Sequence, residues 1–211
     1  MKNHKRALSK EQVDKVVALY SSGKIKETID EIKALNKDYP NVPLLFNLLG
    51  ACYKTLGQLK LAVRAFDTAT SLKPDYAEAY SNLGVTLHEL GRLNQAEEKY
   101  IQAISLKPDH AESRYNLGNT LQELGRLNEA EENYRQAIFL KPDYVEAHYN
   151  LAVLLQELNR LKEAEESYTQ VIALQPKFSE AHSNLGVTLQ QLGRLDEAEA
   201  SHARAIALRP D

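Results

Sequence analysis

Apolar and small residues recur along most of the chain at three- and four-residue steps, the spacing that places them on one face of a helix. Over residues 77–90 this face consists of Tyr80, Leu83, Gly84, Leu87 and Leu90. Over residues 93–106 the residues predicted to face inward are Ala96, Tyr100, Ala103, Ile104 and Leu106. Gly91 stands where a left-handed residue ends many helices, and Pro108 prevents the second segment from continuing. The pattern predicts two helices joined by a short turn.

This helix pair repeats with a period of 34 residues. Six of the seven prolines keep that spacing: Pro40, Pro74, Pro108, Pro142, Pro176 and Pro210. Asn159 takes the turn position that glycine holds in the other repeats, and asparagine tolerates a left-handed backbone better than most residues. Small residues recur where paired helices would cross closely: Gly84 with Ala96, Gly118 with Ala130, Ala152 with Ala164, and Gly186 with Ala198. A fixed period of this length predicts a repeat array.

These residues resemble the tetratricopeptide repeat (TPR), in its period, its Leu-Gly and Ala-x3-Tyr motifs and its closing proline. The resemblance implies an all-α, right-handed superhelical α-solenoid of antiparallel helix pairs, in which the first helix of each pair lines a concave face. We predict twelve helices. The expected organisation is a basic N-terminal tail (1–8), a divergent first repeat or cap (9–42), and repeats at 43–76, 77–110, 111–144, 145–178 and 179–211.

The two ends of the array differ. The first repeat has Val16 and Thr28 at the close-approach positions, and its charged residues predict a polar cap: Lys10, Glu11, Asp14, Lys15, Lys24, Lys26 and Glu27. The last repeat is followed by no capping helix, and Ile206 and Leu208 are predicted on an exposed apolar face. Because array ends usually need a polar cap, we expect either a fragment of a longer protein, which we favour, or an end covered by another molecule.

Charge and composition exclude several classes of protein. The chain has 26 Lys+Arg and 29 Asp+Glu, with residues 1–40 at +3 and the remainder at -6. This balance gives no reason to expect a nucleic-acid or membrane partner. No secretory signal or membrane-length apolar run is present, and the single cysteine excludes a disulfide framework. We therefore expect a soluble, cytoplasmic protein.

No constellation of catalytic or metal-binding residues stands out, so we expect no enzyme activity, metal or cofactor. Cys52 lies among apolar residues and is interpreted as a packing residue. His148 and His182 hold equivalent positions that aromatic residues occupy in earlier repeats, so packing is favoured over a metal site. The adjacent glutamates are interpreted as a solvated helix face: Glu97-Glu98, Glu131-Glu132 and Glu165-Glu166.

The candidate binding residues lie on the first helices. The most regular row is Asn82, Asn116, Asn150 and Asn184. Because an amide both donates and accepts hydrogen bonds, this row predicts contact with the backbone of an extended peptide; the alternative is that it supports neighbouring helices. It is similar to the asparagine ladder in the TPR superhelix of the O-linked N-acetylglucosamine transferases. Tyr115 and Tyr149 would add aromatic contact area in the middle of the groove.

Two glutamate rows are predicted to border the groove. One starts successive helices, with Glu78, Glu112, Glu146 and Glu180, and the other lies near their ends, with Glu89, Glu123 and Glu157. An acidic rim would favour basic or neutral peptides; capping of the helix dipole and solvation are the alternative. The carboxylate clamp of chaperone-binding family members uses Lys and Arg, whereas the corresponding sites here are Ser81, Tyr115, Tyr149 and Ser183. An acidic C-terminal tail is therefore not the expected ligand.

Three functional hypotheses follow. The first is a non-enzymatic interaction scaffold that binds a peptide or protein segment in the concave groove. The second is the substrate-recruiting arm of a larger glycosyltransferase or sulfotransferase. The third is a structural scaffold that associates with itself head-to-tail through the uncapped last repeat.

Overall fold

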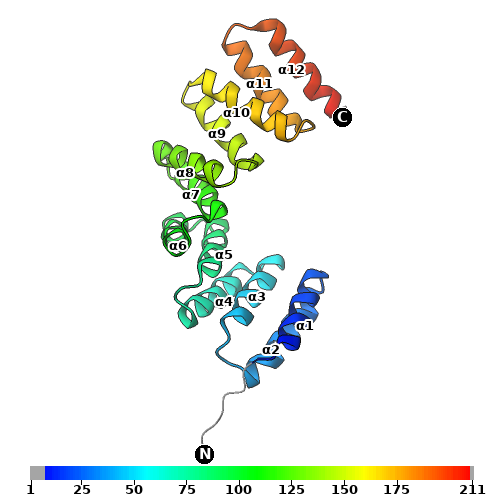
Figure 1. Ribbon diagram of the computed structural model, residues 1–211, viewed down its shortest axis with the longest axis vertical. Coiled ribbons are helices and arrows are strands. Elements are labelled where there is room, and N and C mark those ends of the chain that lie inside the picture. The colour runs from blue at the N-terminus through cyan, green and yellow to red at the C-terminus, as the bar shows by residue number, and fades with distance from the viewer. Residues whose placement is uncertain (1–7, 210–211) are drawn as a thin grey trace, which may run out of the picture. The chain divides into compact units, whose positions relative to one another are not determined.

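The computed structural model describes residues 8–209. Twelve α-helices, and no strand, form the regular structure of this range (Figure 1). The predicted fold class, an all-α solenoid of helix pairs, is confirmed. Of the predicted basic tail only Leu8 is described, and Pro210 and Asp211 of the last repeat also lie outside the described residues.

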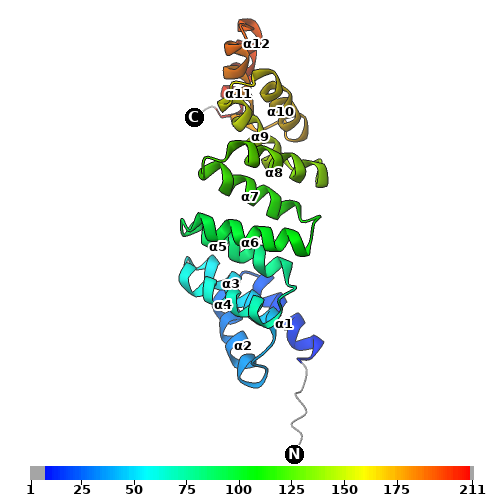
Figure 2. The same cartoon turned by 90° about the vertical axis from the view of Figure 1, so that its left-hand side faces the viewer.

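The described residues up to Pro108 form one compact unit, here called unit 1. Its helices are α1 (Lys10–Ser21), α2 (Ile25–Asp38), α3 (Pro43–Thr55), α4 (Leu59–Leu72), α5 (Ala77–Glu89) and α6 (Leu93–Leu106). Each odd-numbered helix contacts the helix that follows it, α2 contacts α3, and α4 contacts α5. α5 and α6 lie side by side in Figure 2. The core of this unit is therefore a continuous strip between neighbouring helix pairs.

The described residues from Asp109 onward form unit 2. Its helices are α7 (Ala111–Glu123), α8 (Leu127–Leu140), α9 (Val145–Glu157), α10 (Leu161–Leu174), α11 (Ser179–Gln191) and α12 (Leu195–Leu208). α9 contacts both α8 and α10, and it also contacts α11, the first helix of the next pair. The first helices of this unit thus stack on one another, as a binding face made of them requires.

The turns within the helix pairs have the predicted left-handed residue. Gly91 has φ 71°, and Asn159 has φ 57° at the equivalent turn. After α5, the Gly91 N–H donates to the His88 carbonyl (2.8 Å) and the Arg92 N–H donates to the Leu87 carbonyl (2.9 Å). These are the two bonds of a Schellman motif, which satisfies the last carbonyls of a helix.

The close approach of paired helices is confirmed, and an aromatic ring explains it. A Cβ on Gly84 would lie 2.7 Å from the Tyr100 ring, and one on Gly118 would lie 2.7 Å from Tyr134. Both tyrosines are almost fully buried. Leu106, predicted to face inward, is 42% exposed. The prediction was wrong because Leu106 lies about 90° around the helix from the centre of the buried stripe.

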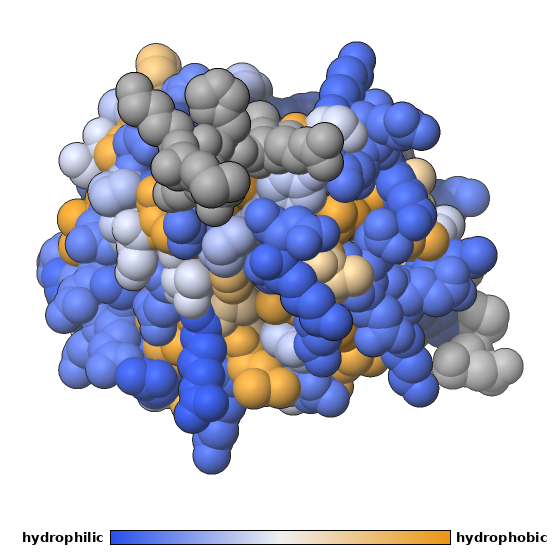
Figure 3. All heavy atoms as spheres, turned by 90° about the horizontal axis from the view of Figure 1, so that it is seen from below, coloured by the Kyte–Doolittle hydropathy of each residue, from blue (hydrophilic) through white to orange (hydrophobic). Residues whose placement is uncertain are grey.

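The first helix pair is polar on its outside and apolar within. Val16 and Thr28 are fully buried, and Ser9 and Gln12 form a capping box at the start of α1. The seven charged residues of the predicted polar surface are all exposed. Figure 3 views the molecule from the side of α1 and α2, where hydrophilic side chains dominate. The last pair differs, because Ala198 is the only buried residue among those described in α12 and Ile206 is 68% exposed.

Candidate peptide-binding face

The asparagine row connects successive first helices in unit 2. The amide nitrogen of Asn184 donates to the Tyr149 hydroxyl (3.0 Å), and that of Asn150 donates to the Tyr115 hydroxyl (3.1 Å). Asn150 also donates to the side-chain oxygen of Asn119 (2.8 Å). Each bond to a tyrosine joins an asparagine to the residue 35 positions before it, and the bond to Asn119 spans 31 positions. The amide nitrogens therefore support the stacking of repeats, whereas the carbonyl oxygens have no donor among the described residues.

The same relation holds in unit 1 with a different partner. Asn82 donates to the side-chain oxygen of Asn47 (3.1 Å), and Asn47 donates to the Tyr76 hydroxyl (3.3 Å). The sequence pattern missed Asn47, because the residue in register with the asparagine row is Leu48. Asn47 could have been found from the position that bonds to the asparagine row. That position lies one residue before the row in each repeat. Asn116 of unit 2 is half-buried on α7.

Tyr115 and Tyr149 are half-buried, and each lies between two other rings. The Tyr115 ring centroid is 5.0 Å from that of Tyr144, and the Tyr149 centroid is 5.0 Å from that of Phe178. Burial raises the pKa of the Tyr144 hydroxyl, and the nearby Tyr115, Glu112 and Glu146 raise the pKa further. The hydroxyls that face the asparagines are thus held in place by ring packing.

Two hollows border this face. In unit 2 a hollow of about 340 Å³ is lined by Tyr149, Ser179, Glu180, Ser183, Asn184, Ala205, Ile206 and Arg209. In unit 1 a hollow of about 280 Å³ is lined by Tyr20, Ala51, Lys54, Thr55, Phe66, Asn82 and Glu89. Predicted site residues from the asparagine, tyrosine and glutamate rows therefore meet around open space in unit 2, and an asparagine meets a glutamate in unit 1.

Several glutamates of the predicted acidic rows have a cation beside them. Lys54 lies 3.0 Å from Glu89, and Lys107 lies 3.5 Å from Glu78. Arg209 pairs with Glu180. Hydrogen bonds from its own backbone and from the Ser179 hydroxyl, together with Arg209, lower the pKa of Glu180. The face is thus less acidic than the number of glutamates in the two rows suggests.

Glu112, Glu146 and Glu157 are exposed and have no ion pair within the described part of the chain. Their charge remains uncompensated, and the first two lie close enough to Tyr144 to raise its pKa. Glu123 belongs to the same row as Glu157 and is exposed at the end of α7. The net negative charge of the face is therefore concentrated in unit 2.

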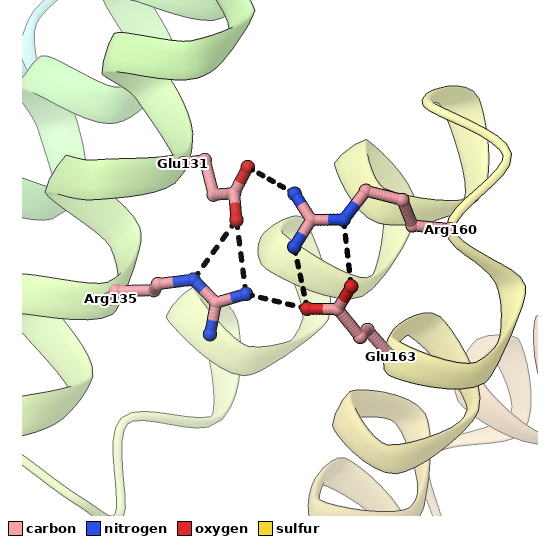
Figure 4. A network of polar contacts seen from close by, with 4 residues as sticks. All are labelled: Glu131, Arg135, Arg160 and Glu163. Carbon is pink, nitrogen blue, oxygen red and sulfur yellow. Dashed lines mark hydrogen bonds and ion pairs between the residues drawn. The ribbon is translucent and has the colours of Figure 1, made fainter.

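Two of the adjacent glutamates, Glu131 and Glu165, are more than a solvated surface, which corrects the sequence interpretation for them, whereas Glu98, Glu132 and Glu166 are exposed as expected. Glu131 is 14% exposed and lies 2.6 Å from Arg160 of the next repeat. Arg160 also binds Glu163 (2.6 Å), and Arg135 joins Glu131 to Glu163 at 3.0 Å from each (Figure 4). Arg194 and Glu165 repeat the contact between repeats, 34 residues later, at 2.6 Å. In two of the three pairs the first glutamate, Glu131 or Glu165, thus connects two repeats.

The remaining candidate chemical groups are engaged in the fold. Cys52 is fully buried, and burial raises the pKa of its thiol to about 11, which leaves it protonated and unreactive at neutral pH. His148 and His182 lie 3.0 and 3.1 Å from the carbonyls of Pro142 and Pro176. Within residues 8–209, no group of three or more potential metal ligands exists, and no helix is long and apolar enough to span a membrane.

Solved structures with a similar fold include several helical-repeat proteins. MamA superposes with a TM-score of 0.73 at 26% identity, covering 76% of this chain and 94% of MamA. YrrB, described as a TPR protein with an unusual peptide-binding site, has a TM-score of 0.72 at 20% identity, covering 85% of this chain and 93% of YrrB. PilF of Pseudomonas aeruginosa has a TM-score of 0.84 at 16% identity, covering 95% of this chain and 91% of PilF. At these low identities, the similarity to YrrB and PilF supports a shared fold and nothing further. No curated protein matches this chain significantly.

Family models identify the repeats themselves. Models described as tetratricopeptide repeat match residues 75–138, 145–178 and 167–200. A model described as TPR repeat matches residues 50–91 and 118–159. Together these matches extend without a gap from residue 50 to residue 200. The chain belongs to the tetratricopeptide-repeat family.

Proposed function

We propose that this protein-interaction scaffold binds an extended peptide along its first helices. The observation that carries the proposal is the geometry of the asparagine row in unit 2. The amide nitrogens of Asn150 and Asn184 are bonded to Tyr115 and Tyr149, so their carbonyl oxygens are held in fixed positions 34 residues apart in the chain. Fixed acceptors suit the backbone N–H groups of an extended chain, because little side-chain entropy is lost on binding.

The hollow beside Asn184 supports contact with a ligand side chain. It brings together an aromatic ring (Tyr149), a hydroxyl (Ser183) and an exposed apolar side chain (Ile206). The similar structure of YrrB, described as having a peptide-binding site, supports the same class of ligand. The uncompensated Glu112, Glu146 and Glu157 favour basic or neutral peptides over acidic ones.

The test begins with a peptide array, followed by calorimetric titration of the peptides that bind. Asn184→Ala is expected to weaken binding at least about tenfold, as loss of a central contact does. Asn128→Ala is the matched control, because Asn128 is exposed on α8 and lies outside the row. If Asn184→Ala leaves every affinity unchanged, the row is only a scaffold.

A second measurement separates binding from stability. Asn184→Ala also removes the bond to Tyr149, so thermal unfolding of each variant is recorded beside its affinity. Asn184→Asp keeps side-chain acceptors while losing the amide donor. If Asn184→Asp binds peptide as the wild type does, and Asn184→Ala does not, the acceptor is the binding group.

Self-association is a second candidate function, supported by the last repeat. Leu195 is 65% exposed and Ile206 is 68% exposed, whereas the equivalent Leu161 and Ile172 are half-buried. Glu199 is equivalent to Glu131 and Glu165, which bind an arginine of the next repeat. A second copy of the chain, stacked head-to-tail, would complete this interface.

The first repeat supplies the matching charge for that contact. Lys24 stands at the turn position that Arg160 and Arg194 hold, and it lies 3.5 Å from Glu27 just as those arginines contact Glu163 and Glu197. Because most exposed residues of α1 are polar, with Val17 and Ala18 as the exceptions, the contact would bury little apolar area, so we expect association only at high concentration. Sedimentation velocity of the wild type and of Leu195→Glu tests the idea. A wild type that stays monomeric at millimolar concentration would rule it out.

A further inference from the structure

A groove on the second helices of unit 2 has features that the peptide-binding face does not explain. It has a volume of about 610 Å³ and is lined by Arg135, Ile138, Phe139, His148, Leu151, Glu166, Ser167 and Gln170. α8 and α10 form its walls, and α9, which contacts both, forms its floor. Leu151 is 4% exposed at the floor, whereas Phe139 is 79% exposed at the edge.

Phe139 distinguishes this groove from its equivalents. The other repeats carry small or polar residues at the same position: Ser71, Ser105, Ala173 and Ala207. The hollow one repeat later is lined by the equivalent Ile172, His182 and Leu185 but has a volume of about 310 Å³. Because the fold accommodates serine or alanine at this position, stability does not require an aromatic ring there.

The charges around the groove determine which partner fits. Arg135 is compensated by Glu131 and Glu163, each 3.0 Å away (Figure 4). Glu166 is exposed, and no cation within residues 8–209 pairs with it. An incoming lysine or arginine would therefore gain an ion pair, whereas an incoming carboxylate would meet Glu166 without compensation.

We propose that this groove binds an amphipathic helix of another protein. The helix inserts one large apolar side chain between Phe139 and Leu151 and brings a lysine or arginine to Glu166. Helical walls on both sides suit a helical ligand, whose apolar residues at three- and four-residue spacing enter such a groove together. An exposed aromatic ring beside a partly filled hollow is the usual anchor of such a contact. This site is separate from the asparagine row and does not depend on it.

Synthetic helices test the proposal. Three stapled helices of identical sequence, with a leucine anchor and Lys, Gln or Glu four residues later, are titrated into the full chain. Binding is followed by fluorescence anisotropy and by amide NMR shifts. We expect the Lys helix to bind best and to shift the amides of residues around Phe139 and Glu166.

Two variants assign the contacts. Phe139→Ser is expected to weaken binding of the Lys helix at least about tenfold without changing thermal unfolding, because Ser71 and Ser105 show that the fold accepts serine there. Glu166→Gln is expected to abolish the preference for Lys over Glu. Ile101→Ser is the matched control, since Ile101 is another exposed apolar residue on a second helix, at 51%.

Three results would overturn the proposal: no amide shift around the groove at millimolar helix, equal binding by Phe139→Ser, or equal binding of the Lys and Glu helices by the wild type. Asn184→Ala distinguishes this site from the peptide-binding face. It is expected to leave the affinity of the Lys helix unchanged, whether or not it alters peptide binding.

Discussion

Neighbouring repeats of unit 2 are joined by two polar networks of different chemistry. On the first helices the contacts are neutral amide-to-hydroxyl bonds, such as that from Asn150 to Tyr115. On the second helices they are ion pairs, such as Glu131 with Arg160. The first network is half-buried, whereas the Arg160 and Arg194 side chains of the second are 38% and 41% exposed.

This difference predicts different energetic roles. A hydrogen bond between half-buried neutral groups leaves an unsatisfied partner when it is broken, and salt does not weaken it. An exposed ion pair contributes at most about 1 kcal/mol and is screened by salt. The first helices therefore fix the spacing of repeats, while the second helices add a weaker, salt-sensitive contact.

Removing the ring that packs between the paired helices should have the largest effect. Tyr168 is fully buried, contacts the Tyr149 ring at 6.0 Å and donates to Gln156 at 3.0 Å. Tyr168→Ala is expected to lower the free energy of unfolding by about 3–5 kcal/mol, the range for loss of a buried aromatic side chain. Urea denaturation followed by circular dichroism measures it. His202→Ala, at the equivalent but half-buried position, should cost less; an equal cost would contradict the role assigned to burial.

Breaking the neutral network should have an intermediate effect. Asn150→Ala leaves the Tyr115 hydroxyl oxygen without its amide donor and leaves the Asn119 oxygen with the Tyr134 hydroxyl as its donor. We expect a loss of about 1–2 kcal/mol in the free energy of unfolding, with the same value at low and high salt. Denaturation of the variant at two salt concentrations, with Asn128→Ala as control, measures it. A loss that disappears at high salt would contradict the neutral character of this network.

Breaking the charged network should have a smaller effect. Glu131→Gln removes one carboxylate from the ring with Arg135, Arg160 and Glu163 (Figure 4). The expected loss is below about 1 kcal/mol at low salt and close to zero in 1 M NaCl. Denaturation of Glu131→Gln and of the wild type at low and high salt measures this loss. A larger loss, or one that salt leaves unchanged, would show that the 14% exposure of Glu131 makes this pair behave as a buried one.

The sequence predicted the repeat and its helices because these depend on local spacing. The turn at Gly91, the exception at Asn159 and the second helix at Leu93–Leu106 were all predicted from the pattern of apolar residues, glycine and proline, and all are confirmed. Leu106 was misplaced because a residue at the edge of an apolar stripe is covered only if a neighbour reaches it.

The candidate site was less predictable, because it depends on contacts between repeats. The asparagine row was visible in register, but its bonds run to residues 35 positions earlier, so Asn47 was missed. The adjacent glutamates were interpreted as solvated because the arginines they bind lie 29 positions later in the chain. Contacts at such offsets follow from the stacking of repeats, which the periodicity within one repeat does not specify.

Acid should weaken the charged network alone, with the smallest effect of all. Hydrogen bonds from Arg160, with the charges of Arg160 and Arg135, lower the pKa of Glu163 below its ordinary value of 4.5. A carboxylate whose pKa is lower in the folded state adds stability above its unfolded pKa, and that contribution is lost as the pH falls through the folded value. The unfolding temperature is measured from pH 7 down to pH values below about 4.5. It should fall less steeply with decreasing pH for Glu163→Gln than for the wild type. Asn150→Ala should follow the wild-type slope, because amides and hydroxyls do not titrate there. Identical slopes for all three proteins would mean that the ion pairs contribute nothing to the stacking of repeats.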